Sequence, residues 1–283
     1  ADHSMNLFTV AFAGSTVTFL YDTKDAREFL TLLFRDVTQQ TSGDVQQHQL
    51  SLLADKGLNE YRLQAGNTQL CRGRLGVRFA AHIYDTVIFH LLNRAENGIA
   101  LHAGAVICND LIILLPGQSG AGKSTLTSWL TCHNCSYLTD ELIFISIHAP
   151  REIKYFSRPL CLKPGSMHLF EELLASAQKD DFLMDRHGAV IPHRLLNREF
   201  KEPQAPPSMI IMPDYAPESD PELEPISSAR LGTLLMGCHV NARNLVDHGF
   251  REVLEIARST PAFRLRYNSL QDASSLLDAF LQE

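Results

Sequence analysis

Residues 111–130 read LIILLPGQSGAGKSTLTSWL and carry the clearest structural pattern of the chain. Its first six residues are an apolar run that predicts a buried strand, and its last residues have the apolar spacing of a helix. The loop between them carries the complete G-x-x-x-x-G-K-[ST] pattern, formed by Gly117, Gln118, Ser119, Gly120, Ala121, Gly122, Lys123 and Ser124. Strand, glycine-rich loop and helix in this order predict an α/β unit that holds a phosphate group at the strand-to-helix junction.

Each part of the loop has a physical role in holding phosphate. The glycines allow backbone conformations that turn N–H groups inward, and the helix that begins near Gly122 adds the positive end of its dipole. Lys123 is expected to reach the β- and γ-phosphates, while Ser124 offers its hydroxyl to Mg²⁺. With Thr125, the loop forms the expected nucleotide-binding set. The motif does not recognise the base, so the ligand is ATP or GTP.

Phosphoryl transfer also needs a proton acceptor and carboxylates for the metal ion. Asp140 and Glu141 are the first acidic pair after the loop, directly before the apolar run LIFIS. We expect them on a parallel strand beside the loop strand, facing the γ-phosphate. An acidic pair at a strand end is also typical of a solvated turn, but the complete loop nearby favours the functional interpretation.

His102 precedes the loop strand in the segment LHAGAV. A tight turn predicted at Asn109 and Asp110 would form a hairpin and bring His102 back toward the glycine-rich loop. A single histidine beside an apolar segment is also typical of a protein core, so both interpretations of His102 stay open.

The composition narrows the class of protein. The chain has 283 residues, of which 45% are hydrophobic and 20% charged, as in ordinary globular proteins. A formal net charge of -7 argues against a general nucleic-acid-binding protein. The sequence contains no apolar stretch of the roughly 18 residues that a membrane helix needs. We therefore expect neither a nucleic-acid partner nor a membrane.

The six cysteines do not form the pattern of a disulfide scaffold in a chain of this size. They are interpreted as reduced thiols of a cytoplasmic protein, and the first residues carry no basic segment followed by an apolar core. Cys132 and Cys135 form a single C-x-x-C, but the second pair that a zinc site needs is missing from the sequence. These two are interpreted as incidental thiols.

The sequence predicts two domains. Residues 1–98 carry no chemical motif and are expected to form an α+β domain with a structural or substrate-docking role. It contains a hairpin around Ala13-Gly14, a helix capped by Asp25, and a long helix that ends at Gly98. Residues 99–283 are expected to form the catalytic domain, with an exposed acidic loop at residues 217–225.

Three segments together resemble a known family: LHAGAV at 101–106, LLPGQSGAGKSTL at 114–126, and LTDE at 138–141. They are similar to the C-terminal catalytic domain of HPr kinase/phosphorylase, and still closer to the broad group of HPr kinase-related proteins. The matching block covers roughly residues 101–147. The resemblance implies a mixed β-sheet P-loop kinase core of the type that is related to phosphoenolpyruvate carboxykinase.

The resemblance also implies roles for the site residues. Asp140 would be the general base, Glu141 would bind Mg²⁺ directly or through water, and His102 would lie close to the phosphate or the acidic pair. Asp140, Glu141 and Ser124 together form the implied metal site, and which carboxylate dominates stays open. Family members associate, so a homo-oligomer is open, although the sequence shows no interface pattern.

Two departures from the family argue against HPr as the acceptor. The second signature of HPr kinase/phosphorylase, an acidic residue followed by Arg-Gly-Leu-Gly, is missing from the sequence, and the first hundred residues do not resemble that family's N-terminal domain. The nearest segment, SRPLCLKPGS at residues 157–166, resembles an Arg-Pro-Leu-x-Leu-Lys run of related members. Arg158 and Lys163 are therefore expected to contact phosphate or acceptor, with a solvent-facing pair as an equal alternative.

Three functions are compatible with these motifs. The first is an ATP- or GTP-dependent kinase acting on a hydroxyl, either a serine of a peptide or protein or a small molecule. The second is a nucleotide-binding regulatory or partner module without transferase activity. The third is a carboxykinase, which would need further metal ligands and an arginine cluster that the sequence does not show. The carboxylates Asp140 and Glu141 favour the first.

Overall fold

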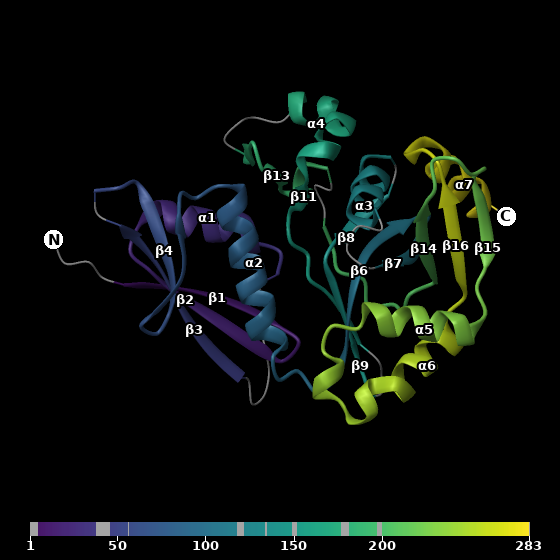
Figure 1. The fold of residues 1–283 in the computed structure, drawn as a ribbon, viewed down its shortest axis with the longest axis horizontal. Helices are drawn as coiled ribbons and strands as arrows, with labels where there is room; N and C mark the ends of the chain where they lie inside the picture. Colours follow the sequence, from purple (N-terminus) through teal and green to yellow (C-terminus); the bar gives the residue numbers. More distant parts are fainter. Residues whose placement is uncertain are drawn as a thin grey trace. The chain divides into compact units, whose positions relative to one another are not determined.

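The chain divides into two units in the computed structural model, which describes residues 5–37, 46–55, 57–117, 122–133, 135–148, 152–176, 181–196 and 200–282. Unit 1 comprises residues 1–95 and 158–192, and unit 2 comprises residues 96–157 and 193–283. The division into domains 1–98 and 99–283 stays a prediction. Residues 158–192, which that division places in the catalytic domain, belong to unit 1 (Figure 1).

Unit 1 contains a five-stranded sheet with two helices packed against it. Its strands follow one another in sequence order: β1 (Asn6–Phe12), β2 (Ser15–Tyr21), β3 (Gln46–Asp55), β4 (Glu60–Ala65) and β5 (Thr68–Gly73). The predicted first hairpin is confirmed, since β1 and β2 pair in antiparallel fashion. Its turn residues Ala13 and Gly14 have φ angles of 53° and 77°. Strand β3 was not predicted.

The two helices of this unit differ from their predicted limits. Helix α1 (Lys24–Phe34) is capped by Thr23, whose Oγ1 accepts a hydrogen bond from the Ala26 amide, and the predicted cap Asp25 lies in the first turn. Helix α2 (Val77–Leu92) ends six residues before the predicted Gly98. Gly98 instead begins a strand of unit 2, where it packs against the Phe144 ring and leaves no room for a Cβ.

Residues 158–192 join unit 1 because they form a small sheet that packs against α2. The elements of this segment are β11 (Leu160–Leu162), η1 (Pro164–Phe170), α4 (Glu171–Ser176), β12 (Leu183–Asp185) and β13 (Gly188–Ile191). The carboxylate of Asp185 accepts a hydrogen bond of 3.1 Å from the Val77 amide at the start of α2. A carboxylate at a helix N-terminus is favoured by the helix dipole, which stabilises this docking.

Unit 2 is built on an eight-stranded mixed sheet in the order β10-β9-β6-β7-β14-β16-β15, with β8 also paired to β6. The strands are β6 (Gly98–Cys108), β7 (Leu111–Pro116), β8 (Ser136–Thr139), β9 (Leu142–Ser146), β10 (Ile153–Tyr155), β14 (Met209–Tyr215), β15 (Glu222–Pro225) and β16 (Ala262–Tyr267). Strand β14 pairs in parallel with both β7 and β16, whereas β6 pairs with its neighbours in antiparallel fashion. The expectation of an α/β chain with a mixed sheet is therefore confirmed.

The acidic segment predicted as an exposed loop, residues 217–225, contains the edge strand β15. Its glutamates are not simply solvated, because Glu224 forms an ion pair with Arg264, and Glu222 lies 3.5 Å from Arg266 on the neighbouring β16. The arginines of the later strand were too distant in sequence to be recognised as partners.

Two helices cover each face of this sheet (Figure 1). They are α3 (Lys123–Cys132) and α7 (Leu270–Phe280) on one face, and α5 (Ser228–Cys238) and α6 (Phe250–Ser259) on the other. Strand β7 is buried on both sides, with Ile112 and Leu114 facing one layer of helices and Ile113 and Leu115 the other. None of the helices among the described residues is both long and apolar enough to cross a membrane.

Strand β8 does not lie where the sequence placed it. We expected it to run parallel to β7 as its neighbour, but β6 lies between them. Strands β8 and β9 both pair in antiparallel fashion with β6, and Asp140 and Glu141 separate the two strands. The Ala103 amide of β6 donates a 3.2 Å hydrogen bond to the Glu141 carbonyl at this interruption, which we call the acidic bend (residues 140–141).

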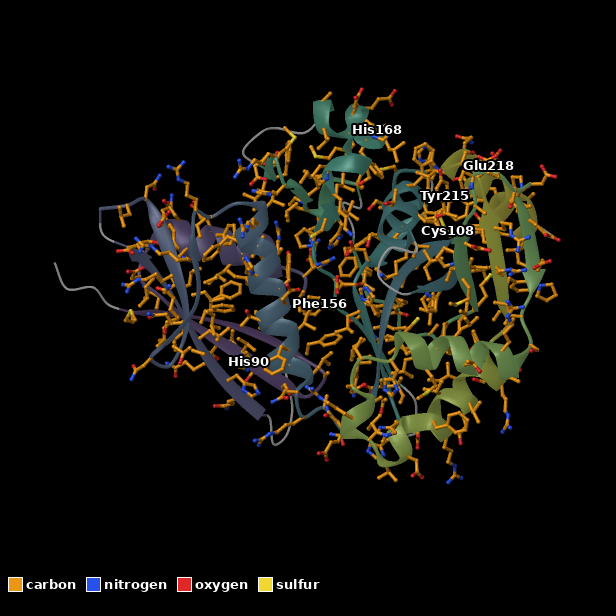
Figure 2. All side chains as sticks on the ribbon, viewed as in Figure 1. His90, Cys108, Phe156, His168, Tyr215 and Glu218 are labelled. Carbon is orange, nitrogen blue, oxygen red and sulfur yellow. A yellow bond between two sulfur atoms is a disulfide. The ribbon has the colours of Figure 1, made fainter. Side chains whose placement is uncertain are left out.

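The expectation that all cysteines are reduced is wrong for one pair. Cys108 at the end of β6 and Cys135 just before β8 form a disulfide with a Cα–Cα distance of 4.5 Å (Figure 2). This pair continues the antiparallel register of β6 and β8, and directly opposite residues in such a ladder come close enough to bond. The described free cysteines are Cys71, Cys132, Cys161 and Cys238, so Cys132 and Cys135 are not joined.

Close packing of α3 on β6 depends on Gly104. A Cβ built on Gly104 would overlap the side chain of Thr127 on α3. We expect Gly104→Ala to lower the free energy of unfolding by about 1–3 kcal/mol, because overpacking forces the helix and the strand apart. Urea denaturation measures this, with Gly165→Ala as control, since a Cβ at Gly165 meets no heavy atom within 4 Å. Equal stability of the two variants would contradict the packing argument.

Candidate functional site

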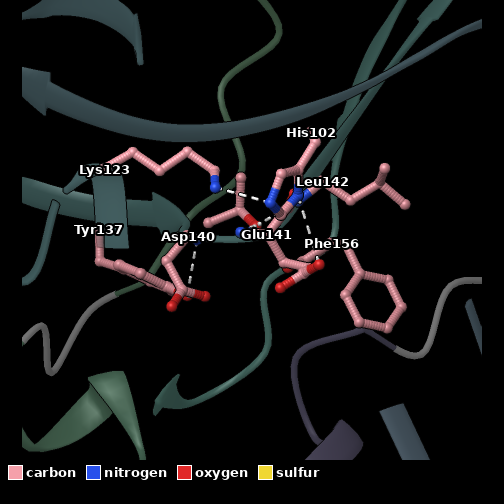
Figure 3. A network of polar contacts seen from close by, with 8 residues as sticks. His102, Lys123, Tyr137, Asp140, Glu141, Leu142 and Phe156 are labelled. Atoms are coloured by element: carbon pink, nitrogen blue, oxygen red, sulfur yellow. Dashed lines mark hydrogen bonds and ion pairs between the residues drawn. The ribbon is translucent and has the colours of Figure 1, made fainter. Parts of the chain in front are cut away.

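Four of the predicted site residues come together in unit 2 (Figure 3). His102 lies on β6, Lys123 is the first residue of α3, and Asp140 and Glu141 form the acidic bend. Figure 3 shows both carboxyl groups on the same side, below the contact between Lys123 and His102 in that view. Residues up to 39 positions apart in the chain thus share one polar network.

The predicted hairpin brings His102 to the loop. Strands β6 and β7 pair in antiparallel fashion around Asn109 and Asp110, whose φ angles of 49° and 63° fit a tight turn. The pairing ends where Ala103 lies opposite Pro116, and the Gly117 amide donates a 3.4 Å hydrogen bond to the His102 carbonyl. The first residue of the glycine-rich loop is therefore held beside His102, as predicted.

Lys123 is almost completely buried, with 4% of its surface exposed. Its Nζ lies 2.6 Å from Nε2 of His102, which gives the buried ammonium an acceptor. Nδ1 of His102 lies 2.9 Å from the Glu141 carbonyl, which can only accept, so Nδ1 donates and Nε2 accepts in the neutral imidazole. The loop lysine is thereby linked through His102 to the acidic bend.

Glu141 also approaches His102 with its side chain. Its Oε1 lies 3.4 Å from Nδ1 of the imidazole, and about a quarter of each side chain is exposed, 24% for His102 and 23% for Glu141. This partial exposure leaves the carboxylate accessible for a metal ion or a water ligand. His102 is therefore part of a polar network with Lys123 and Glu141, and its functional role stays a prediction.

Asp140 is fully buried. Its hydrogen-bond partner is Tyr137, which was not predicted as a site residue. The Tyr137 hydroxyl donates a 3.1 Å hydrogen bond to Asp140 Oδ1 and accepts a 3.0 Å hydrogen bond from the Asp140 amide. The only signal in the sequence was a tyrosine three residues before the acid, at the edge of an apolar strand. Such spacing is common and would not single out Tyr137.

The acidic bend has a defined backbone. Thr139 Oγ1 accepts a 3.1 Å hydrogen bond from the Glu141 amide and donates one of 2.7 Å to the Phe156 carbonyl. The register of β8 against β6 shifts by one residue between Tyr137 and Thr139, which is a β-bulge. Bulges next to functional sites re-aim side chains, and this one immediately precedes Asp140.

Four residues of the phosphate-loop pattern are described, namely Gly117, Gly122, Lys123 and Ser124. Gly122 has φ 80° and ψ 0°, a left-handed conformation that glycine adopts without strain, and it caps α3. Glycine offers no side chain to the first N–H groups of the helix, which suits an anion as their partner. Ser124 and Thr125 lie in the first turn of α3, both half-buried. The predicted loop residues Gln118, Ser119, Gly120 and Ala121 lie outside the described residues.

Two further groups beside the loop are kept neutral by burial. Burial raises the pKa of the Cys238 thiol, and the Lys123 ammonium and the Gly117 amide lower it in part. Burial, followed by Tyr215 and Asp214, raises the pKa of Tyr267 to about 12, and the Tyr267 hydroxyl packs against Gly122. Neutral groups at these positions do not repel an anion.

Arg158 and Lys163 lie in unit 1. The guanidinium of Arg158 is 5.1 Å from the centre of the Tyr84 ring, in a cation–π contact. Lys163 is exposed and precedes η1. Their expected contacts with phosphate or acceptor stay predictions.

The oxygen donors of the site are of the type that Mg²⁺ binds. They are the Ser124 hydroxyl and the carboxylates of Asp140 and Glu141. Across the described part of the chain, no group of three or more His, Cys, Asp or Glu side chains is placed to hold a metal ion. A site with only two carboxylates fits a magnesium ion that takes its other ligands from phosphate and water.

Comparison with known proteins adds one distant similarity. No family model and no curated protein matches the chain. Among solved structures, the HPr(Ser) kinase/phosphatase from Coxiella burnetii is similar over 65% of this chain and 97% of that chain, with 9% sequence identity and a TM-score of 0.33. A similarity at this level does not identify a function for the chain.

Proposed function

We propose that this chain is an ATP- or GTP-dependent kinase that transfers the γ-phosphoryl group to a hydroxyl. The observation that supports the proposal is the contact network from Lys123 through His102 to Glu141. It joins the lysine of a complete phosphate-loop pattern to Glu141, one of the two acids of the acidic bend. Phosphoryl transfer needs both a phosphate clamp and acids close to it, whereas simple nucleotide binding needs only the clamp.

Each residue has a role in this proposal. The loop residues Gly117 to Thr125 bind the phosphates, and Lys123 exchanges its contact with His102 for phosphate oxygens. Ser124, Glu141 and Asp140 would hold Mg²⁺, which when bound neutralises charge on the phosphates. Asp140 accepts the proton of the acceptor hydroxyl as the oxygen attacks the γ-phosphorus, and the bond to the bridging oxygen breaks to release the nucleoside diphosphate. The proposed acceptor is a serine of a peptide or protein, or a small molecule, with residues 1–98 in a structural or substrate-docking role.

One observation favours a second candidate. Asp140 is fully buried, whereas a general base has to reach the acceptor. A nucleotide-binding module without transfer activity would tolerate such burial. The kinase proposal requires that nucleotide binding opens access to Asp140, as ligand-driven rearrangements do in many enzymes.

A transfer assay separates the two candidates. The purified chain is incubated with Mg²⁺ and γ-³²P-labelled ATP or GTP, with serine peptides and cell extract as sources of acceptor. A labelled acceptor supports the kinase, and binding without turnover supports the module. If neither nucleotide binds, both candidates fail.

Replacing Lys123 with methionine is expected to weaken nucleotide binding by roughly 10- to 100-fold. Loss of a charge-assisted contact costs about 1.5–3 kcal/mol, and each 1.4 kcal/mol is a factor of ten. A fluorescent nucleotide analogue measures the affinity. Lys201→Met is the matched control, since Lys201 is an exposed lysine of the same unit. Equal loss of affinity in both variants would point to an indirect effect.

A further inference from the structure

We infer that Tyr137 is the positioning residue of Asp140, and that His193 fixes the tyrosine ring. The inference rests on the proposed function for the role of Asp140 in transfer. The Tyr137 hydroxyl forms two hydrogen bonds with Asp140. It accepts one of 3.0 Å from the Asp140 amide and donates one of 3.1 Å to Oδ1 of the carboxyl group. One hydroxyl therefore restrains the backbone and the side-chain torsions of the proposed base together.

The ring of Tyr137 is held from its other side. His193 stacks on it with ring centroids 4.9 Å apart and an interplanar angle of 28°. His193 is 1% exposed, and the edge-to-face contact with Phe200 at 4.7 Å fixes its ring in turn. Stacked and edge-to-face aromatic pairs have restricted geometry, so the position of the hydroxyl is set by this stack.

The same bend is held at a second point. Ser157 Oγ donates a 2.7 Å hydrogen bond to the Leu138 carbonyl, and the Phe156 carbonyl accepts one from Thr139. The chain leaves unit 2 after Ser157 and returns to it at His193. Two of the three points at which the chain passes between the units, after Ser157 and before His193, therefore lie beside the segment that carries Asp140. The direction in which the Asp140 carboxyl group points therefore depends on these side-chain contacts as well as on strand pairing.

A base transfers a proton efficiently only when its oxygen points at the acceptor hydroxyl. The Tyr137 hydroxyl directs Oδ1 toward itself and so determines which way Oδ2 turns. Displacements of about 1 Å in a reacting group cost up to about 100-fold in rate. Tyr137 does not contact the reacting atoms in this scheme, and it acts through Asp140.

Tyr137→Phe tests the inference, because it keeps the ring and its stack on His193 but deletes the hydroxyl. We expect kcat to fall by about 10- to 100-fold, while the KM and the dissociation constant for nucleotide change less than about twofold. Tyr155→Phe is the matched control. Tyr155 is a buried tyrosine of the same unit whose hydroxyl has no hydrogen-bond partner among the described residues, so kcat should not change.

A second measurement does not depend on turnover. In Tyr137→Phe the Asp140 amide loses its acceptor, so its hydrogen exchange should accelerate at least about tenfold, while the Phe156 amide, bonded to the Leu142 carbonyl, keeps its rate. If the wild type shows no transfer, the proposed function fails. The exchange rate of the Asp140 amide then still tests whether the Tyr137 hydroxyl restrains Asp140.

Three results would overturn the inference. They are a wild-type kcat in Tyr137→Phe, a parallel loss of nucleotide affinity and kcat, or unchanged exchange of the Asp140 amide. If Tyr137→Phe does not fold, His193→Leu provides the test, since it removes the stacked ring and leaves the hydroxyl. It should slow transfer and accelerate the same amide, and wild-type values for both would count against the inference.

Discussion

Asp140→Asn is expected to slow phosphoryl transfer about a hundred- to ten-thousand-fold and to leave nucleotide binding nearly intact. The amide has the shape of the carboxyl group and still offers an oxygen to the Tyr137 hydroxyl, so the bend should keep its conformation. It cannot take up the acceptor proton, however. Transfer is measured with γ-³²P-labelled nucleotide and the acceptor that the wild type labels, and binding is measured by calorimetry.

Asp110→Asn is the matched control for this variant. Asp110 is an exposed residue of the β6–β7 turn with φ 63°, a conformation that asparagine tolerates well. The same chemical change at Asp110 should leave transfer unchanged. Transfer in Asp140→Asn within a few-fold of the wild type would remove Asp140 as the base.

Removing the disulfide is expected to produce the largest loss of stability. Cys108→Ala together with Cys135→Ala should lower the free energy of unfolding by roughly 3–4 kcal/mol, because the bond closes a loop over a sequence separation of 27 residues. That loop contains β7, the glycine-rich loop and α3, so the unfolded chain gains freedom over the whole phosphate-binding segment. Urea denaturation of the double variant and the wild type measures the difference.

Thiol titration provides the control for the disulfide itself. The denatured, unreduced chain should expose four thiols, and reduction should raise the number to the six cysteines of the sequence. A variant with Cys161→Ala, a free cysteine of unit 1, should unfold at nearly the wild-type urea concentration. Six thiols before reduction would show that Cys108 and Cys135 are not bonded.

The sequence predicts the part of the site that depends on neighbouring residues. The hairpin of β6 and β7 follows from the turn at Asn109 and Asp110 between two apolar runs, and the start of α3 follows from the glycine-rich loop. Because the hairpin is local, the approach of His102 to the loop was predictable. The sequence also indicated that Lys123, His102 and Glu141 would lie close together. The strand arrangement expected to bring them together, with the acidic pair on a strand directly beside β7, was wrong.

The remaining features depend on contacts between distant segments. Strand β6 lies between β7 and β8 because its residues pair with both, and no local pattern distinguishes this order from direct pairing of β7 and β8. The partner of Cys135 is set by the register of that pairing, and the nearest cysteine in the sequence, Cys132, was misleading. His193 comes to Tyr137 from 56 residues away, after the chain has passed through unit 1.

The proposed function requires that the loop lysine and the acidic bend act on one nucleotide. A crystal structure of the full chain with Mg²⁺ and a non-hydrolysable ATP analogue tests it most directly through the position of Lys123 Nζ. We expect Nζ to leave His102 Nε2, now 2.6 Å away, and to donate a hydrogen bond to the γ-phosphate, with Asp140 facing the space beyond it. A nucleotide bound away from Lys123, or a γ-phosphate remote from Asp140 and Glu141, would rule out the proposed function.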